Sequence, residues 1–583
     1  MAETTKGHRY IVIYGKGGIG KTTVATNLAE SLTGEFGQKV LLVGCSPKSS
    51  LNDIYGITDS SLPLMDLKRK EGVNAQNINK AVWKISERLT LTETGGPEPG
   101  VGCAGAGLIA AFEDLQKYKK ETGIEEVDYT IYDLIGDIVC GGFSLPLKGS
   151  GREVLIVLNG ELMALYAANN ILRGVGNIGG IKVLGYVANM RNVHNEQQIV
   201  AAFSERTKVP VLAYVPRDIA GLRQAEQKNV PVVRSLPDSE IAEVFRRLAK
   251  QIYEQPVGAN PSPIEKYDEL FDMYMKFQES RIKVKEGSAA AYQKKIPSEV
   301  VKRKEPKRIS IYGTGGIGKS TVSANVSASL VLMGERVFQI GCDPKHDSIA
   351  NLCGELKPPV LDVVVKMGGV RGVRPEVLET LIFPGARHKD RLYGAECGGP
   401  LPGKGCGGRG VELALKLFEQ HHMFSKRDYT FLLFDILGDT ICGGFARPLK
   451  YTPYVYIVTN GEIASMTQAM KIAQSIEAAK TRGTNVGIAG IINNMRGVQN
   501  EQKIVEEVFG AVGLTVTHHI PRSELVQQAE NLRTTIVEVF PDSEQAGHYM
   551  ELARNIQDNT ELHSLTREIL SLREIRDIVN KYS

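Results

Sequence analysis

An α/β protein made of two similar halves is what the sequence predicts, each half with a mainly parallel β-sheet and helices on both faces. Two observations predict it. Short and almost continuously apolar runs alternate with helical patterns, which is typical of parallel strands that are covered on both sides. The same order of motifs also occurs twice within the 583 residues. The repeat is far longer than that of a solenoid, so we expect a duplicated domain.

The duplication is visible in five pairs of motifs, separated by about 300 residues. They are Tyr14–Thr22 and Tyr312–Ser320, Gly44–Lys48 and Gly341–Lys345, Gly95–Cys103 and Gly398–Cys406, Val187–Arg191 and Ile492–Arg496, and Val215–Arg217 and Ile520–Arg522. We expect domains at 1–255 and 308–560. Between them we place a proline-containing and charged linker, 256–307, with a helical segment at 267–281. A charged C-terminal helix is predicted within 561–583, from Leu562 to Val579.

In chain order, six apolar runs of the first half predict its strands: 10–14, 40–43, 129–134, 154–158, 183–188 and 211–214. Helices are predicted directly after the glycine-rich loops, at 22–32 and 320–332.

Composition excludes several classes of protein. The apolar fraction of 42% suits a soluble globular chain, no apolar run could span a bilayer, and residues 1–6 lack the apolar core of a signal peptide. A net charge of +4 gives no reason to expect nucleic acid or an anionic membrane as a partner. The basic run Lys302–Arg308 suits a nucleic-acid patch or a solvated tether, and its Glu and Pro favour the tether. We therefore expect a cytoplasmic protein.

Two loops have the residues that bind nucleotide phosphates. Each fits G-x-x-x-x-G-K-[ST], follows an apolar strand and opens a helix. Backbone N–H groups would face phosphate oxygens, the lysine would neutralise the terminal phosphates, and the hydroxyl would bind magnesium. We therefore expect ATP and magnesium. The predicted residues are Gly15, Gly17, Gly18, Gly20, Lys21, Thr22 and Thr23, then Gly313, Gly315, Gly316, Gly318, Lys319, Ser320 and Thr321.

Lys16 adds a second lysine to the first loop. This deviant Walker A form occurs in P-loop NTPases that dimerise face to face, where the extra lysine crosses to the nucleotide of the partner domain. A charge supplied in this way can raise phosphoryl-transfer rates by about 10³–10⁵. The second half has Thr314 instead. We therefore predict two P-loop NTPase domains arranged as a pseudo-homodimer.

Each half also has two aspartates and a cysteine within eight positions: Asp133, Asp137 and Cys140, then Asp435, Asp439 and Cys442. An aspartate at a strand end suits a magnesium ion at a phosphate, so Asp133 and Asp435 are assigned to the magnesium region with Thr22 and Ser320. Cys103 and Cys406 provide a second cysteine in each half, again beside glycines.

A 4Fe–4S cluster needs four thiolates, so the two halves would share one cluster on Cys103, Cys140, Cys406 and Cys442. Zinc on four cysteines is the alternative. The long spacing and the adjacent nucleotide switch favour iron–sulfur. We interpret Cys45 and Cys342 as buried thiols, and we expect neither Cys353 nor Cys397 to be a cluster ligand.

Together these residues resemble the iron protein of nitrogenase and its relatives, the ATP-dependent reductase subunits of protochlorophyllide and chlorophyllide reductase. The motifs that carry the resemblance are the deviant loop, Cys-Asp-Pro-Lys, Gly-Cys-x-Gly and Asp-x-x-Gly-Asp-x-x-Cys-Gly-Gly-Phe. It covers both halves but not the linker or the last twenty or so residues. It implies a homodimer-like protein, here fused into one chain, with one bridging 4Fe–4S cluster. The histidine between Lys345 and Asp347 is closer to the tetrapyrrole-reductase branch.

The resemblance also assigns residues to roles. Asp343 and Asp347 belong to the first switch and the magnesium–phosphate region, whereas the first half has Ser46 and Ser50. Asp439 would orient or activate the attacking water. The predicted catalytic set is therefore Lys16, Lys319, Asp343, Asp347 and Asp439. Contacts around the adenine are assigned to Asn189, Pro216, Arg217, Asn494, Pro521 and Arg522.

The losses in the two halves are complementary. The second half keeps the switch aspartates and the first half keeps the trans lysine, so we expect one competent composite ATPase site and one degenerate site. The function that follows is ATP-dependent donation of single electrons, with ferredoxin or flavodoxin as reductant and a nitrogenase-like catalytic protein as acceptor. The alternatives are a fused ATPase for metalloid or anion transport, a cluster carrier, and a regulatory relative. We expect a monomer that acts as a pseudo-dimer, with a chain-exchanged dimer as the other arrangement.

Overall fold

The structure is a computed structural model, which describes residues 7–46, 50–57, 62–96, 104–134, 146, 152–254, 258–278, 292, 295–343, 347–388, 390–399, 407–437 and 447–582. The chain divides into two compact units. Among the described residues, unit one consists of 7–278 and unit two of 292–582. In the described part of the chain, no helix is long and apolar enough to cross a membrane.

Unit one is built on an eight-stranded sheet with the order β3-β4-β2-β5-β1-β6-β7-β8. Only β3 runs antiparallel to its neighbour. The strands are β1 Arg9–Tyr14, β2 Val40–Gly44, β3 Val82–Lys84, β4 Leu89–Glu93, β5 Tyr129–Asp133, β6 Arg152–Leu158, β7 Ile181–Asn189 and β8 Val211–Val215. All six strands predicted for this half are confirmed, most of them longer by one or two residues.

Unit two repeats this topology with the order β11-β12-β10-β13-β9-β14-β15-β16, and β11 is the antiparallel edge strand. The strands are β9 Lys307–Gly313, β10 Val337–Cys342, β11 Phe383–Pro384, β12 Leu392–Glu396, β13 Phe431–Ile436, β14 Tyr454–Thr459, β15 Gly487–Asn494 and β16 Val516–Ile520. The predicted α/β fold with mainly parallel sheets and its duplication are thus confirmed.

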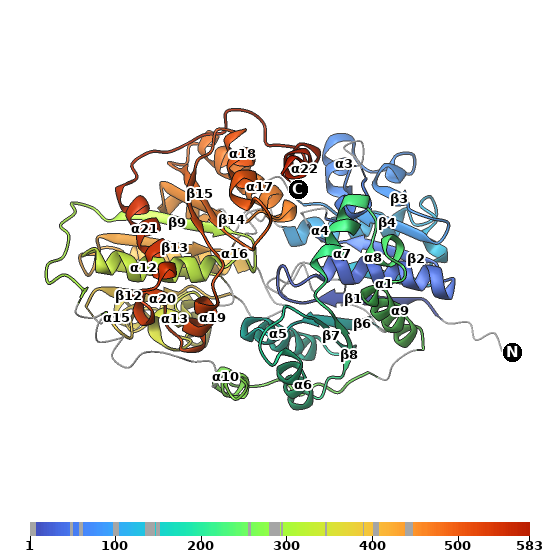
Figure 1. The fold of residues 1–583 in the computed structure, drawn as a ribbon, viewed down its shortest axis with the longest axis horizontal. Helices are drawn as coiled ribbons and strands as arrows, with labels where there is room; N and C mark the ends of the chain where they lie inside the picture. The colour runs from blue at the N-terminus through green and yellow to red at the C-terminus, as the bar shows by residue number, and fades with distance from the viewer. Residues whose placement is uncertain are drawn as a thin grey trace. The chain divides into compact units, whose positions relative to one another are not determined.

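Helices cover the sheet in each unit (Figure 1). Those of unit one are α1 Lys21–Phe36, α2 Ser50–Ile54, α3 Leu64–Glu71, α4 Ala104–Lys117, α5 Leu162–Ile178, α6 Glu196–Thr207, α7 Ile219–Lys228, α8 Val232–Ser235, α9 Glu240–Tyr253 and α10 Tyr267–Met275. Those of unit two are α12 Lys319–Leu332, α13 Ala350–Cys353, α14 Val360–Lys366, α15 Pro375–Glu379, α16 Gly407–Gln420, α17 Ile463–Thr481, α18 Glu501–Gly510, α19 Glu524–Asn531, α20 Ile536–Val539, α21 Glu544–Asp558 and α22 Leu572–Lys581.

Strand β13 shows why the apolar runs are continuous. Its residues alternate between two cores: Phe431 and Leu433 pack with α12 and α21, whereas Leu432 and Phe434 pack on the opposite face with α16 and α17. Successive side chains of a strand point to opposite faces, so a sheet that is covered on both faces needs apolar residues at every position. On the first face, α12 lies beside α21, and α1 lies beside α9 in unit one.

The segments that sequence analysis set apart from the domains belong to them in the structure. Helix α10 packs against α5 and α6, and α22 packs in the same way against α17 and α18. Asn195 donates to the Phe277 carbonyl (3.0 Å), and Asn500 donates to the Tyr582 carbonyl (2.9 Å). Helix α22 is therefore the second copy of α10, and both close a repeat.

The C-terminal helix is shorter than predicted. Residues 562–570 are not helical; His563 instead pairs with Ile488 at the start of β15, as Ala259 pairs with Val183 in unit one. Because β16 pairs with β15 only from Ile491 onwards, this segment takes the open position beside the start of β15. The helix begins at Leu572, where Ser571 and Glu574 form a capping box.

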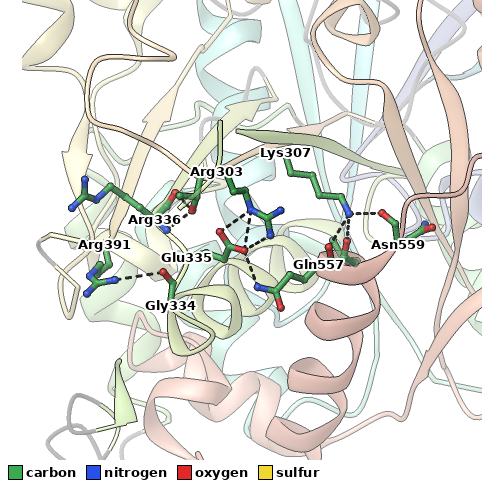
Figure 2. A network of polar contacts seen from close by, with 10 residues as sticks. Arg303, Lys307, Gly334, Glu335, Arg336, Arg391, Gln557 and Asn559 are labelled. Atoms are coloured by element: carbon green, nitrogen blue, oxygen red, sulfur yellow. Dashed lines mark hydrogen bonds and ion pairs between the residues drawn. The ribbon is translucent and has the colours of Figure 1, made fainter. Parts of the chain in front are cut away.

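A polar network lies at the start of unit two (Figure 2). Arg303 makes a bidentate contact with the buried carboxylate of Glu335, which also accepts from the Gln557 amide at 2.7 Å. The ammonium of Lys307 donates to the carbonyls of residues 556, 557 and 559 at the end of α21. A cation there satisfies carbonyls that have no partner within the helix. The network ties the first residues of β9 to the end of α21.

Candidate nucleotide and metal centre

The phosphate loop of unit one, residues 15–20, lies between β1 and α1. Gly20 is the N-cap residue of α1 and has φ +97°. A Cβ at Gly20 would collide with the Asn189 side chain, and a Cβ at Gly15 would collide with the Val157 carbonyl. The loop therefore requires glycine at both positions. Lys21 Nζ donates to the Lys16 carbonyl at 3.2 Å, which curls the lysine over the loop.

Unit two has the same loop, residues 313–318, but a more acidic surrounding. Lys319 is buried and its Nζ lies 3.2 Å from Asp435 Oδ1. Burial alone would lower the pKa of Lys319, but the charges of Asp435, Asp343 and Asp347 outweigh it and raise this pKa. The structure thus brings three of the predicted aspartates of this half close to the ammonium group of Lys319, itself a predicted residue. Thr321, two residues after Lys319, donates to Glu530 at 2.6 Å.

The two strand-end aspartates have the same position in the two sheets. Asp133 pairs in register with Gly44 and Ile13, and Asp435 pairs with Gly341 and Ile311. This is the carboxyl edge of a parallel sheet, where ligands of such folds bind. Thr22 Oγ1 donates to Asp133 Oδ2 at 2.6 Å.

Each aspartate has one carboxylate oxygen, Asp133 Oδ1 or Asp435 Oδ2, that is buried without a hydrogen-bond partner among the described residues. Burial raises the pKa of Asp133 to about 6, against the opposing effects of the Thr22 hydrogen bond and the Lys21 charge. A buried and unpartnered carboxylate oxygen is costly by itself. It fits a site that holds a cation, since magnesium takes oxygen ligands.

Lys16 makes an ion pair within its own unit. Its Nζ lies 3.5 Å from Glu161 Oε2, and both side chains remain partly exposed. In unit two, Thr314 has the position of Lys16, and its carbonyl accepts from Ile317 in the same way that Lys16 accepts from Ile19. The backbone of the loop is thus preserved although the charge is not.

The predicted adenine contacts divide into two groups. Asn189 and Asn494 hold the phosphate loops, because their amides donate to the carbonyls of Ile19 (2.7 Å) and Ile317 (2.6 Å). Pro216 and Arg217 line a cavity of about 630 Å³ between β8 and α9. In unit two, the Pro521 carbonyl accepts from Gln545 (3.1 Å), and Arg522 is exposed.

Sequence analysis missed two buried glutamates, one in each unit. Each holds two loops at the ends of neighbouring strands, those after β6 and β7 in unit one and those after β14 and β15 in unit two. Glu196 accepts from the backbone N–H groups of residues 160, 191 and 193, and Glu501 accepts from those of 461, 496, 497 and 498. Arg191 and Arg496, held in this way, donate to the phosphate-loop carbonyls of Gly18 (2.9 Å) and Gly316 (2.7 Å). One feature of the sequence could have revealed them: in both halves a glutamate follows the Asn-Met-Arg motif after five residues.

Buried groups also lie beside the predicted switch of unit two. Burial and the charges of Asp347 and Asp435 raise the pKa of Glu396 well above its ordinary value, although the Ile349 N–H donates to this carboxyl. Cys342 and Cys397 have their Sγ atoms 4.0 Å apart and are fully buried. Cys45, Cys342, Cys353 and Cys397 are free and buried, so the interpretation of Cys45 and Cys342 as buried thiols is confirmed.

Several predicted residues lie outside the described part of the chain: Asp137, Asp439 and the four cysteines Cys103, Cys140, Cys406 and Cys442. Their roles stay predictions. The backbone of Ser50 is described as the first residue of α2, and Ser46 is buried at the end of β2.

Solved structures that resemble part of the chain include ATPases of the MinD and ParA types. The cell division ATPase MinD of Pyrococcus furiosus is 24% identical, with a TM-score of 0.33, over 42% of this chain and 98% of that one. MinD of Pyrococcus horikoshii OT3, complexed with Mg-ADP, is 24% identical with a TM-score of 0.33, over 42% and 96%. A ParA family ATPase from Chlorobium tepidum is 21% identical with a TM-score of 0.33, over 42% and 99%.

The comparison with protein families covers both units. Residues 9–280 match one family, and residues 307–583 match the same family again. The two matches include α10 and α22 and leave out most of the segment between the units, so they extend beyond the motifs and through the last twenty residues. With its two phosphate loops and their strand-end aspartates, the chain belongs to the 4Fe-4S iron sulfur cluster binding proteins of the NifH/frxC family, as a tandem pair of family members.

Proposed function

We propose that the chain is an ATP-dependent iron–sulfur electron donor. Ferredoxin or flavodoxin would reduce it, and it would pass electrons to a nitrogenase-like catalytic protein. One arrangement, common to both units, carries the proposal. A phosphate loop lies against a strand-end aspartate with an open carboxylate oxygen, and seven residues further on the chain reaches a predicted cluster cysteine, Cys140 or Cys442. A change at the nucleotide would therefore be transmitted along a short stretch of backbone to the cluster.

The described residues of the two phosphate sites fit nucleotide and magnesium. Thr22 with Asp133, and Ser320 with Asp435, offer oxygen ligands for magnesium, and Lys21 and Lys319 would neutralise the phosphates. Cys103, Cys140, Cys406 and Cys442 would supply the four thiolates of one 4Fe–4S cluster, a proposal that the family match supports. When bound, the cluster supplies single electrons of low potential.

The two units would contribute unequally to ATP hydrolysis. Lys319 of unit two lies among three aspartates, whereas unit one has Ser46 and Ser50 in place of two of them. Unit one instead supplies Lys16. In the proposed composite site, Lys16 leaves Glu161 and neutralises charge at the nucleotide of unit two, while Asp439 orients the attacking water.

The electron-donor role is tested by iron content and electron paramagnetic resonance of the anaerobically purified, dithionite-reduced chain. We expect about four irons per chain and a reduced-cluster signal that MgATP perturbs. Little iron after anaerobic reconstitution would instead support a fused ATPase for anion transport. Transfer of the intact cluster to apo-acceptors, without any effect of MgATP, would support a cluster carrier.

The composite site is tested by Lys16→Ala. We expect steady-state ATPase activity to fall by about 10³-fold or more, the range for a charge supplied in trans. Thr314→Ala, at the equivalent position, is the matched control and should keep the activity of the parent chain. Retained activity in Lys16→Ala would contradict the composite site but leave the cluster assignment untouched.

A further inference from the structure

Unit two has a cluster of three metal-ligating side chains away from its phosphate loop. His518 lies on the edge strand β16, and His548 and Glu551 lie three residues apart on α21, which packs against that strand. One ligand atom from each residue lies within 4.8 Å of the other two. Residues at i and i+3 share one face of a helix, so both α21 side chains face the histidine of β16.

The two imidazoles already have the spacing of metal ligands. His518 Nε2 lies 3.1 Å from His548 Nδ1. Two imidazole nitrogens bound to a tetrahedral zinc ion at about 2.0–2.1 Å would be about 3.3 Å apart. On metal binding the distance between the two nitrogens would thus change by only a few tenths of an ångström, the rings would turn so that both lone pairs face the ion, and the exposed Glu551 would move closer to it.

In this contact one ring nitrogen donates and the other accepts. In the neutral tautomers that place each proton on the other ring nitrogen, both facing nitrogens keep a lone pair for a cation. Two imidazole nitrogens and one carboxylate are a usual set of ligands for a late first-row divalent cation.

Unit one shows that the fold does not require these residues. Ala213 on β8 and Val244 and Arg247 on α9 have the equivalent positions, counted from the register of β7 with β8 and from the serine N-caps of α9 and α21. There they line the cavity of about 630 Å³. The triad therefore occupies, in unit two alone, a place that is open in unit one.

We propose that His518, His548 and Glu551 form a binding site for a late first-row divalent cation such as Zn²⁺, separate from the magnesium and iron–sulfur sites. The bound ion joins the edge strand β16 to α21. Because α21 also packs on α12, the helix that the phosphate loop opens, the ion stiffens the base of the nucleotide site in unit two. This site does not depend on the electron-donor function.

The experiment uses the full-length, anaerobically purified chain with its iron–sulfur cluster as isolated. Bound zinc is counted by mass spectrometry after equilibrium dialysis against micromolar Zn²⁺, and thermal unfolding is followed with and without Zn²⁺. The test variant is His518→Ala/His548→Val/Glu551→Arg, which places the unit-one residues in unit two. The matched control is His519→Tyr, since unit one has Tyr214 there and His519 contacts Asn493 and Glu506 instead.

We expect the parent chain and His519→Tyr to bind about one zinc more per chain than the triple variant, and only these two to melt at higher temperature with Zn²⁺. The zinc that the triple variant still binds measures the background binding by cysteine thiols. Equal zinc in all three proteins, or an equal melting shift, overturns the proposal. If the triple variant does not fold, His548→Val alone replaces it, and we expect zinc affinity to fall at least ~10–100-fold; unchanged affinity again overturns the site.

Discussion

At the scale of single residues, the open carboxylate oxygens of Asp133 and Asp435 tell the most about chemistry. Both lie at the end of a central strand and are buried, and the surrounding protein leaves one oxygen of each without a partner among the described residues. Folding alone does not favour such an arrangement. It is expected where a ligand provides the missing partner.

The two aspartates are not expected to be equally important. Asp435→Asn keeps the shape but removes the charge, and we expect ATPase activity at saturating MgATP to fall by about 10²–10³-fold, the usual effect of losing one electrostatic stabiliser. Asp133→Asn should leave the rate within about two-fold, because unit one lacks the switch aspartates. Equal losses in the two variants would mean that both units hydrolyse ATP.

A second residue-scale prediction concerns the buried pair of His388 and Glu538, whose Nε2 and Oε1 atoms are 2.7 Å apart. Burial alone would raise the pKa of Glu538, but hydrogen bonds from His388, Thr534 and Thr535 hold it below its ordinary value of 4.5. The carboxylate therefore stabilises the fold above pH 4.5, and this contribution is lost as pH falls through the lowered pKa.

Glu538→Gln should lower the free energy of unfolding at pH 7 by about 3–5 kcal/mol, because one partner of a buried pair is removed. Its stability should also fall less steeply than that of the parent chain below pH 4.5. Chemical denaturation across pH 3.5–7 measures both. The control is Glu507→Gln, which breaks an exposed pair with Lys581 and should cost less than about 1 kcal/mol. A parallel pH dependence in Glu538→Gln and the parent would contradict the assignment.

The sequence showed the residues of the phosphate loop but not those that hold it. The loops follow from a local pattern in which glycine and lysine have fixed spacing. Glu196 and Glu501 recur five residues after each Asn-Met-Arg motif, but an acidic residue at the start of a helix is ordinary, and only the fold brings the loop after β7 or β15 onto it. The same is true of Asn189 and Asn494, which sequence analysis assigned to the adenine and which brace the loop in the structure.

At the scale of elements, the equivalence of α10 and α22 defines where each repeat ends. The pattern of charges predicted a helix in both places but not its partner, because amphipathicity shows that a face is buried and not against what. Among the strands of unit one, β3 and β4 were missed; the three residues of β3 are too few to show a period.

If α22 is the closing element of unit two, its one fully buried residue should be important for stability. Ile575 packs into the core formed by α17 and the sheet. We expect Ile575→Ala to lower the free energy of unfolding by about 2–5 kcal/mol, measured by chemical denaturation. Asp577→Ala, an exposed position on the same helix, should change it by less than about 0.5 kcal/mol. Equal stability of the two variants would show that α22 only rests on the surface.

At the scale of the whole molecule, the two units share one topology but have diverged around the phosphates. Unit two has Asp343 and Asp347, and unit one has Ser46 and Ser50. The phosphate loops themselves keep a similar glycine geometry, with φ +97° at Gly20 and +89° at Gly318. Sequence comparison of the halves was enough to reveal it.

The divergence should be reversible. Ser46→Asp/Ser50→Asp in unit one, combined with Thr314→Lys in unit two, restores the missing charges of the degenerate site. We expect ATPase activity to rise by about two-fold if the two sites act independently, with Ser46→Asp/Ser50→Asp alone as the control. No gain over the parent chain would show that the degenerate site lacks more than these three charges.

Each repeat is closed by its own helix, α10 or α22, and one continuous segment joins the first repeat to the second. Because this segment joins the two repeats covalently, it also decides the amounts in which they are made. Two diverged copies encoded on separate chains would be synthesised in varying amounts, and copies of the same kind would compete for partners. Fusion fixes their stoichiometry at one to one in every molecule, so each copy was free to lose what the other retained.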